Sequence, residues 1–301
     1  MIIGDLILDH YVFGNVNRIS PEAPVPIVEV TKEKSALGGS GNVIQNLYNL
    51  GVSLEILSSV GNDINGKKII SMLSKMMIKT DSIFSSNKTQ TNYKMRIIAN
   101  NQHVVRSDWD NRNLDEKIEQ SICDAISSKI NVIDGVIVSD YAKGVCTDKI
   151  IKEIISTARS LKKPVFIDPK GADWTKYKGS TFITPNTKEI ASIINSDPNC
   201  DIDFVKAGEI IINEFEINNC LITRGADGVT FVNQEQSFHI GSEAREVYDV
   251  SGAGDTVIAC LSLAILQGKS IKDSVKFANK AAGIVVSHIG TTAITLDELE
   301  F

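Results

Sequence analysis

The residues best suited to chemistry lie near the end of the chain, where Gly252, Ala253 and Gly254 leave the backbone unshielded. An apolar run follows them and predicts a helix. Free N–H groups at the start of a helix, together with the helix dipole, bind anions such as phosphate. Asp255 would lie beside that anion, where a carboxylate can take a proton from the group that attacks the phosphate. The same residues could instead form only a turn and a favourable helix start.

The elements that would position this segment follow a regular pattern from residue 114 onward. Apolar runs typical of strands alternate with helical patterns, which predicts a mostly parallel sheet covered by helices on both faces. We expect helices at 114–128, 148–161, 188–194, 204–215, 253–266 and 271–287. We expect strands at 132–138, 164–167, 181–183 and 220–222, and a hairpin over 229–240.

Polar, turn-forming residues come directly after each of these four strands. The segments are 139–144, 168–170, 184–189 and 223–228. Any one of them could be a plain loop. Because open α/β sheets bind ligands at the carboxyl ends of their strands, four such segments together with Asp255 predict a ligand site at this edge.

The N-terminal part has a different character. A buried first strand is expected at 1–8, and prolines within 21–26 exclude a helix or a central strand there. Short apolar pairs broken by Asn100 and Asn101 predict a hairpin within 91–107. We therefore expect one domain spanning 1–301, with lid strands at about 11–31 and 89–107. Exposed strand edges in such a lid favour a homodimer.

Two glycine-rich segments resemble nucleotide-binding motifs and fail on detail. The segment 38–42 opens a helix that reaches about residue 50, but Ile44 replaces the third glycine of a dinucleotide fingerprint. The segment 61–68 approaches a P-loop, but Lys68 replaces the hydroxyl residue that would hold magnesium. We interpret both as turns.

Composition narrows the class of protein. The net charge is −6, from 31 basic and 37 acidic residues without a basic block, so no nucleic-acid partner is expected. The five cysteines are scattered and the four histidines lack metal-site spacing, which favours reduced thiols in the cytoplasm over a disulfide frame or zinc site. The N-terminus is not typical of a signal peptide, and no apolar run has the length of a membrane span.

Four motifs in order carry a family resemblance: Gly38-Gly39 with Asn42, Asn186-x-x-Glu189, Thr223-Arg224-Gly225-x-x-Gly228, and Gly252-Ala253-Gly254-Asp255. In this combination the chain resembles the ribokinase-like (PfkB) carbohydrate kinases over nearly its whole length. The longer segments 18–26, 139–144 and 167–171 are most similar to the members that phosphorylate D-glycero-β-D-manno-heptose 7-phosphate.

The resemblance implies a three-layer α/β/α fold, with a mostly parallel central sheet and a small β-strand lid. It implies ATP and Mg²⁺ as cofactors and transfer of phosphate to the anomeric hydroxyl of the sugar, as in lipopolysaccharide precursor synthesis. Asp255 would be the base, and the N–H groups of 252–255 would form the anion hole. Asn186 and Glu189 would order Mg²⁺ through water.

The resemblance also implies binding residues. Contacts to the nucleotide are expected from Asn186, Thr187, Lys188, Glu189, Thr223, Gly225 and Gly228. Contacts to the sugar are expected from Asp9, Gly38, Gly39, Asn42 and Asp140. Candidates for the substrate's phosphate are Arg18, Lys94, Arg96, Arg106, Lys143 and Lys170, of which Arg106 and Lys170 are favoured. Asp249 and Ser251 resemble a monovalent-cation loop, and a plain turn is the alternative.

The sequence also bears on adenylyl transfer and on alternative functions. No H-x-G-H motif is present, so adenylyl transfer is not expected of this chain, and a separate adenylyltransferase could act with it. The alternatives are a kinase of another sugar, sugar phosphate or nucleoside, and a non-catalytic sugar- or nucleotide-binding regulator.

Overall fold

The main sheet is built from parallel strands with an antiparallel edge. The computed structural model describes residues 1–100, 102–244, 247–288, 290 and 292–299. Within those ranges nine strands pair in the order β13-β12-β11-β10-β9-β8-β1-β4-β5. Their bounds are β1 Ile2–Gly4, β4 Ile56–Gly61, β5 Ile83–Ser86, β8 Val136–Ser139, β9 Val165–Asp168, β10 Phe182–Ile183, β11 Asn219–Thr223, β12 Val229–Asn233 and β13 Ser237–Ile240. Only β12 and β13 run antiparallel to their neighbours in this sheet.

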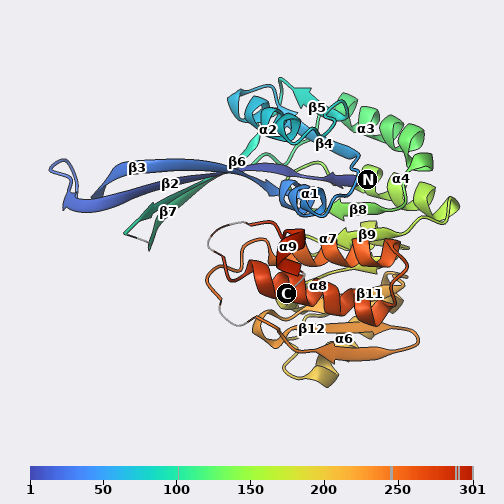
Figure 1. Cartoon of the computed structure of the whole chain (residues 1–301). Helices are drawn as coiled ribbons and strands as arrows, with labels where there is room; N and C mark the ends of the chain where they lie inside the picture. Colours follow the sequence, from blue (N-terminus) through green and yellow to red (C-terminus); the bar gives the residue numbers. More distant parts are fainter. Residues whose placement is uncertain (101, 245–246, 289, 291, 300–301) are drawn as a thin grey trace.

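Helices cover both faces of this sheet (Figure 1). One layer contains α3 Glu116–Lys129, α4 Asp148–Ser160, α5 Thr187–Ile194 and α6 Asp201–Glu214. The other contains α1 Ser40–Asn49, α2 Ile64–Lys75, α7 Ala253–Leu266 and α8 Ile271–Val285. Neighbouring strand residues alternate between the layers: Ile3 is buried with the first and Ile2 with the second. The expected three-layer α/β/α arrangement is therefore present.

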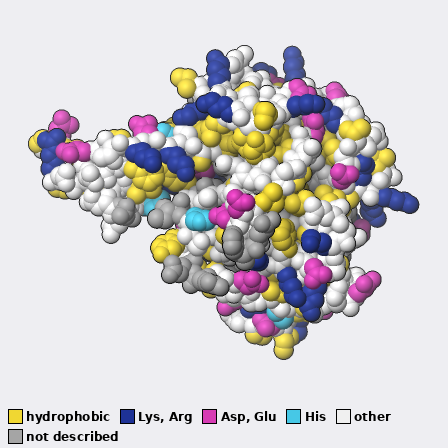
Figure 2. All heavy atoms as spheres, in the orientation of Figure 1, with side chains coloured by type: hydrophobic (Ala, Val, Ile, Leu, Met, Phe, Trp, Pro, Cys, Tyr) yellow, Lys and Arg dark blue, Asp and Glu magenta, His cyan; other side chains and the backbone are white. Residues whose placement is uncertain are grey.

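A second sheet projects from the body as a lid (Figure 1). Its strands lie in the order β3-β2-β6-β7, with bounds β2 Leu6–Ile19, β3 Pro26–Gly39, β6 Asn92–Ala99 and β7 Gln102–Trp109. Hydrophobic side chains are exposed on the lid (Figure 2), among them Ile19, Val30 and Trp109. The hairpin expected at Asn100-Asn101 joins β6 to β7, although Asn101 itself lies outside the described residues.

The first strand differs from the expectation. A continuous strand over 1–8 is wrong, because the chain leaves the main sheet at Asp5. β1 ends at Gly4, and β2 begins at Leu6 and continues into the lid. An apolar run cannot reveal this change of sheet, because both strands are buried there. The lid strands accordingly extend beyond the range 11–31, since β2 starts earlier and β3 reaches Gly39.

Most remaining elements follow the sequence pattern, although the strand expected at 132–138 begins only at Val136, after a 3-10 helix over Ile130–Val132. Helix α7 has the predicted bounds, and α1 begins within the glycine-rich segment 38–42 as expected. The short elements β5 and α9 Leu296–Leu299 were not predicted, since four residues are too few to establish a period. Over the described part of the chain, none of the helices combines the length and apolar character needed to cross a membrane.

Candidate active site

Polar segments from four neighbouring strands meet at one edge of the main sheet. Strands β8, β9, β10 and β11 are adjacent and parallel, so their carboxyl ends lie side by side. An isolated bridge pairs Asn186 with Thr223 and joins the loops that follow β10 and β11. The expectation that these segments gather at one edge is confirmed, and this is the edge where α/β sheets bind ligands.

The N-terminus of α7 opens toward this edge. Gly252 precedes the helix with a φ of 85°, a left-handed conformation that glycine adopts without strain. A Cβ added at Gly254 would meet no atom within 4 Å, so the backbone there borders open space. The first N–H groups of a helix have no partner within the helix. This arrangement fits a phosphate group placed against the backbone of 252–255.

Asp255 lies in the first turn of α7 and is 4% exposed. Its two oxygens have different partners: Asn42 Nδ2 donates to Oδ2 at 2.9 Å, and Tyr141 Oη donates to Oδ1 at 2.8 Å. Burial raises the pKa of Asp255 to about 6, although both hydrogen bonds lower it. A buried carboxylate with a pKa just below neutrality is suited to act as a general base.

Asn42 and Tyr141 come from separate parts of the fold. Asn42 lies on α1, where Asn46 Nδ2 donates to its carbonyl oxygen at 2.9 Å. Tyr141 follows β8, and its place beside Asp255 was not predicted. The sequence identifies the segment 139–144 only as a polar, turn-forming segment after a strand. Nothing in the sequence reveals that this tyrosine reaches α7, because more than a hundred residues separate them.

Asp168 adds a further carboxylate to this edge, in addition to Asp255 and Glu189. Asp168 ends β9, and no side chain in the described part of the chain pairs with it. Burial, followed by the charges of Asp255 and Glu189, raises the pKa of Asp168 well above its usual range. Sequence reasoning placed this residue at a strand end without giving it a role. The sequence does not reveal that Asp168 lies near Asp255 and Glu189 without an ion-pair partner among the described residues.

The Asn186-x-x-Glu189 motif forms a capping box at the start of α5. Asn186 Oδ1 accepts the N–H groups of Lys188 and Glu189 at 3.0 Å each, and Glu189 Oε2 accepts the Asn186 N–H at 3.0 Å. The other oxygen, Oε1, pairs with Lys170 Nζ at 2.8 Å. The motif therefore has a structural role, and it fixes the Glu189 carboxylate at the ligand edge. Thr187 and Lys188 form the first turn of the same helix.

The loop after β11 is shaped by its glycines. Gly225 and Gly228 have φ values of 60° and 83°. A Cβ at Gly228 would lie 2.1 Å from the Ile240 carbonyl oxygen, whereas one at Gly225 would meet nothing within 4 Å. Thr223 is half-buried at the strand end. Gly228 is thus required for the close approach of β13, while Gly225 leaves room for a ligand.

The expected sugar residues lie at the base of the lid. Asp9 on β2 is 5% exposed and accepts a hydrogen bond from Arg96 Nη1 at 2.5 Å. Gly38 lies opposite, where an added Cβ would be 2.1 Å from Asp9 Oδ2. Gly39, with a φ of 58°, precedes α1. These residues therefore lie together. Arg96, a candidate for the substrate's phosphate, forms an ion pair with Asp9.

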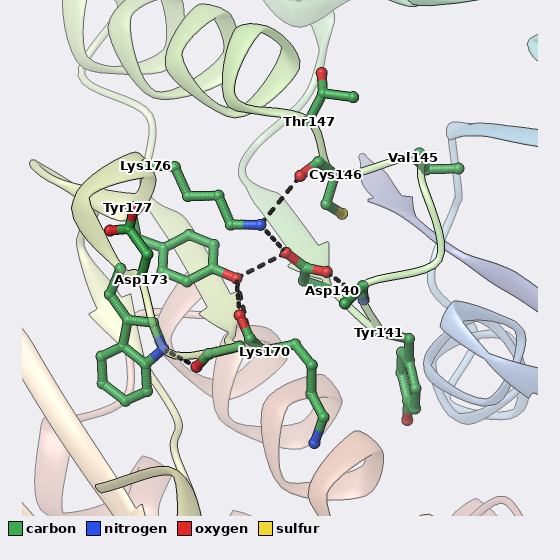
Figure 3. A network of polar contacts seen from close by, with 12 residues as sticks. Asp140, Tyr141, Val145, Cys146, Thr147, Lys170, Asp173, Lys176 and Tyr177 are labelled. Carbon is green, nitrogen blue, oxygen red and sulfur yellow. Dashed lines mark hydrogen bonds and ion pairs between the residues drawn. The ribbon is translucent and has the colours of Figure 1, made fainter. Parts of the chain in front are cut away.

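Asp140 has a different environment from the one expected for a sugar contact. Its Oδ2 accepts from Lys176 Nζ at 2.5 Å and from Tyr177 Oη at 2.7 Å, and its Oδ1 accepts the Ala142 N–H at 2.7 Å (Figure 3). The side chain has no exposed area. Both oxygens therefore have protein partners, and the sugar contact expected of Asp140 stays a prediction.

The cations expected to hold the substrate's phosphate are dispersed. Arg106 is 59% exposed on the lid and pairs with Asp108, and Lys170 pairs with Glu189. These two favoured residues thus pair with different acids on different parts of the fold, and their role at the substrate's phosphate stays a prediction. Arg18 is exposed near the tip of the lid, and Lys143 pairs with Asp110.

Lys94 differs from the other cations. It is half-buried on β6, its Nζ lies 5.9 Å from the centroid of the Tyr141 ring, and no ion pair engages it among the described side chains. Burial lowers the pKa of Lys94, and the charge of Lys94 lowers the pKa of Asp255. Of the candidate cations, Lys94 is the one placed next to the candidate base.

The parallel sheet, the open helix N-terminus and the buried base together define a phosphoryl-transfer enzyme. Residues 1–298 match the family model described as pfkB family carbohydrate kinase. The chain belongs to this family, and it is an ATP-dependent carbohydrate kinase.

Curated relatives support the same family. The chain is 40% identical over 300 residues to the Bifunctional protein HldE of Aliarcobacter butzleri, a match covering 99% of this chain and 63% of that protein. It is 40% identical over 300 residues to the protein of the same name from Helicobacter pylori, covering 99% of this chain and 65% of that protein. The chain thus spans less than two thirds of the length of these relatives.

Solved structures show the fold. Phosphofructokinase-2 from Escherichia coli, in complex with substrates and products, has a TM-score of 0.82 at 18% identity, covering 99% of this chain and 96% of that one. Ribokinase from Arabidopsis thaliana, complexed with ribose and ATP, has a TM-score of 0.75 at 18% identity, covering 100% and 98%. The chain therefore has the ribokinase-like fold.

Proposed function

We propose that this chain transfers the terminal phosphoryl group of ATP to the anomeric hydroxyl of D-glycero-β-D-manno-heptose 7-phosphate, giving the 1,7-bisphosphate for a lipopolysaccharide precursor. The observation that carries the reaction type is the buried Asp255 carboxylate beside the open N-terminus of α7. The segments 18–26, 139–144 and 167–171 support the choice of sugar, because they are similar to the heptose phosphate kinases.

The proposed chemistry follows from the arrangement around α7. An Asp255 oxygen accepts the proton of the sugar hydroxyl as the sugar oxygen bonds to the terminal phosphorus of ATP, and the bond from that phosphorus to the ADP oxygen breaks. The N–H groups of Gly254 and Asp255 stabilise the negative charge of the group in transit. Little covalent chemistry is needed from the protein, since such a transfer depends mainly on positioning and charge.

The nucleotide would lie over the loops after β10 and β11, with Thr223, Gly225 and Gly228 beside it. The surrounding acids fit a divalent cation, because no described side chain forms an ion pair with Asp168, whose pKa is raised by burial and then by the charges of Asp255 and Glu189. Glu189 would hold Mg²⁺ through water, and Asn186 would keep Glu189 in place by the capping box. Bound Mg²⁺ would neutralise the charge of the ATP phosphates.

The sugar would lie between the lid and α7, near Asp9, Gly38, Gly39 and Asn42. A carboxylate can accept two hydroxyl groups of a polyol, and Asp9 keeps one oxygen beside Gly38 for this purpose. We assign the nearest positive charge for the substrate to Lys94, in place of Arg106 and Lys170, because Lys94 alone of these three has no acidic partner within the described residues.

The first test is ADP release with ATP, Mg²⁺ and D-glycero-β-D-manno-heptose 7-phosphate, compared with a panel of other sugars, sugar phosphates and nucleosides. We expect turnover with the heptose phosphate and a loss of about a hundredfold or more in Asp255→Asn, the scale of general-base removal. Turnover with a different panel member would replace the substrate. Ligand-induced melting shifts without any ADP release would favour a non-catalytic regulator.

We also propose a homodimer and consider two further partners, an adenylyltransferase and a monovalent cation. Exposed hydrophobic side chains and strand edges on the lid support a homodimer through that sheet, which sedimentation equilibrium would detect. The curated relatives are longer and named bifunctional, so they do not require a separate adenylyltransferase partner. For a monovalent cation, Asp249 is the candidate, although its oxygens already accept the N–H groups of Ser251 and Gly290.

A further inference from the structure

The candidate base is held by one hydrogen-bond donor on each oxygen. Tyr141 Oη donates to Asp255 Oδ1 at 2.8 Å, and Asn42 Nδ2 donates to Oδ2 at 2.9 Å. We propose that Tyr141 is a positioning residue for phosphoryl transfer, which fixes the rotation of the Asp255 carboxylate and keeps it ionised for the attacking hydroxyl. This inference rests on the proposed role of Asp255 as the base.

The geometry suits a clamp that leaves the base able to react. Each carboxylate oxygen has two lone-pair positions, so a single donor on each leaves one for the sugar hydroxyl. A rotation of the carboxylate would break both hydrogen bonds at once, and a misdirected base loses much of its effect. The two donors therefore preset the plane in which the base accepts its proton.

Tyr141 acts as a donor and not as a proton relay. Burial, together with the charge of Asp255, raises the pKa of Tyr141 well above its usual range. The phenol therefore keeps its proton throughout the reaction. A hydrogen bond to the ionised form of a carboxylate stabilises that form, so Tyr141 opposes the effect of burial on Asp255.

A single residue anchors both arms of the clamp. The carboxylate of Asp5 accepts the N–H groups of Tyr141, Lys143 and Val145 at 2.9, 3.1 and 2.8 Å. Its backbone carbonyl accepts the N–H of Ser40 at 3.0 Å, at the start of the helix that carries Asn42. So extensive a set of contacts would not be expected for a tyrosine that reached Asp255 by chance.

The backbone of the Tyr141 loop is adapted to this position. Ala142 has a φ of 54° and Gly144 a φ of 108°, both in the left-handed region. Asp140 Oδ1 accepts the Ala142 N–H at 2.7 Å, and Lys176 and Tyr177 hold the other oxygen of Asp140 (Figure 3). The network around Asp140 thus supports the same loop, and the carboxylate of Asp140 lies within 4.8 Å of that of Asp5.

Charged groups from other elements also face Asp255 and must be included in any pH argument. Asp9 on β2 raises its pKa and Lys94 on β6 lowers it. Asp168 on β9 interacts with it electrostatically. All three remain in a variant that lacks only the phenolic hydroxyl, so a comparison with the unmodified protein isolates the contribution of Tyr141.

The first experiment measures kcat/KM against pH for Tyr141→Phe, because this ratio reports the free enzyme's groups. Loss of a donor to an ionised group is expected to move the acidic limb upward by about one pH unit. Activity would then fall about fivefold more at pH 6 than at pH 8.5, where any remaining loss reports the orientation of the carboxylate. Tyr48→Phe is the matched control, since Tyr48 lies on α1 with its side chain partly exposed and is not part of the clamp. An equal loss at every pH, or an unchanged limb, would overturn the proposal.

The second experiment needs no turnover. Urea unfolding of Tyr141→Phe, Asp255→Asn and the double variant measures the coupling between the Tyr141 hydroxyl and the charge of Asp255, since the substituted amide can still hydrogen-bond to Tyr141. We expect a coupling of about tenfold in the folding equilibrium constant at pH 8. It should fall toward a factor of one, which means no coupling, at about pH 4.5, where Asp255 is protonated. Additive effects at both pH values would refute the clamp. If no sugar of the panel is phosphorylated but the coupling is found, the proposed function fails and the clamp does not.

Discussion

Replacing the candidate base should stabilise the folded chain while it removes activity. Asp255 is a buried carboxylate whose pKa is raised by burial from the usual 3.8 to about 6. In Asp255→Asn the amide oxygen can still accept from Asn42, and the amide nitrogen can donate to the oxygen of Tyr141. The substitution therefore removes the buried charge and leaves both neighbours with a hydrogen bond.

The magnitude follows from the pKa. A shift of about two units corresponds to about 3 kcal/mol, which the ionised side chain costs the native state. As pH rises, the unfolded chain releases its proton first, so the unmodified protein loses stability between about pH 4 and pH 6. The stability advantage of Asp255→Asn over the unmodified protein should therefore increase between about pH 4 and pH 6 and stay constant above about pH 7. For 301 residues, 1 kcal/mol corresponds to about 1.5 °C, so we expect a melting temperature about 5 °C higher at pH 8.

Denaturation should be measured at pH 4.5, 6 and 8 without ATP or sugar, because either ligand would stabilise the native state. Asp197→Asn is the matched control, since Asp197 is exposed in the loop after α5 and should show little change at any pH. If Asp255→Asn is no more stable than the unmodified protein at pH 8, or if its advantage is the same at pH 4.5, burial does not raise the pKa of Asp255 as argued.

Three further substitutions test other parts of the site. Gly38→Ala would place a methyl group 2.1 Å from Asp9 Oδ2, and we expect the KM for the sugar to rise about tenfold while the KM for ATP is unchanged. Glu189→Gln can keep the capping hydrogen bond to Asn186, so its melting temperature should hold while its activity requires about tenfold more Mg²⁺ in a titration. Lys94→Met keeps the side-chain stem and removes a half-buried charge, so kcat/KM should fall at least about tenfold without loss of stability in urea.

The layered architecture was predictable from the sequence because its signal is periodic. Alternating apolar strands and helical patterns after residue 114 gave the parallel sheet, and turn-forming residues after four strands marked the ligand edge. Helix α7 was correct to the residue, since glycines precede a long apolar run. Such local signals do not depend on what lies elsewhere in the chain.

The arrangement of side chains was less predictable because it depends on contacts distant in sequence. A strand-end acid such as Asp140 has the same local pattern whether it faces a ligand or a lysine, and only the fold brings Lys176 to it. Likewise, Arg106 and Lys170 are both basic residues near ligand-binding segments, but one lies on the lid and the other beside Glu189. Residue type indicates what a side chain can bind, whereas tertiary packing decides which partner is present.

Asp5 connects the unpredicted change of sheet with the chemistry of the site. The chain leaves the main sheet at this residue, and the same residue binds the Tyr141 loop through its carboxylate and the start of α1 through its carbonyl. Burial, with the charge of Asp140, raises the pKa of Asp5 to about 6 despite three N–H donors. An ionised group held at such a cost is poorly explained by stability alone, since an apolar residue could continue the strand. Its presence is explained if the lid strand, α1 and the Tyr141 loop must keep one relative position for Asp255 to face the sugar.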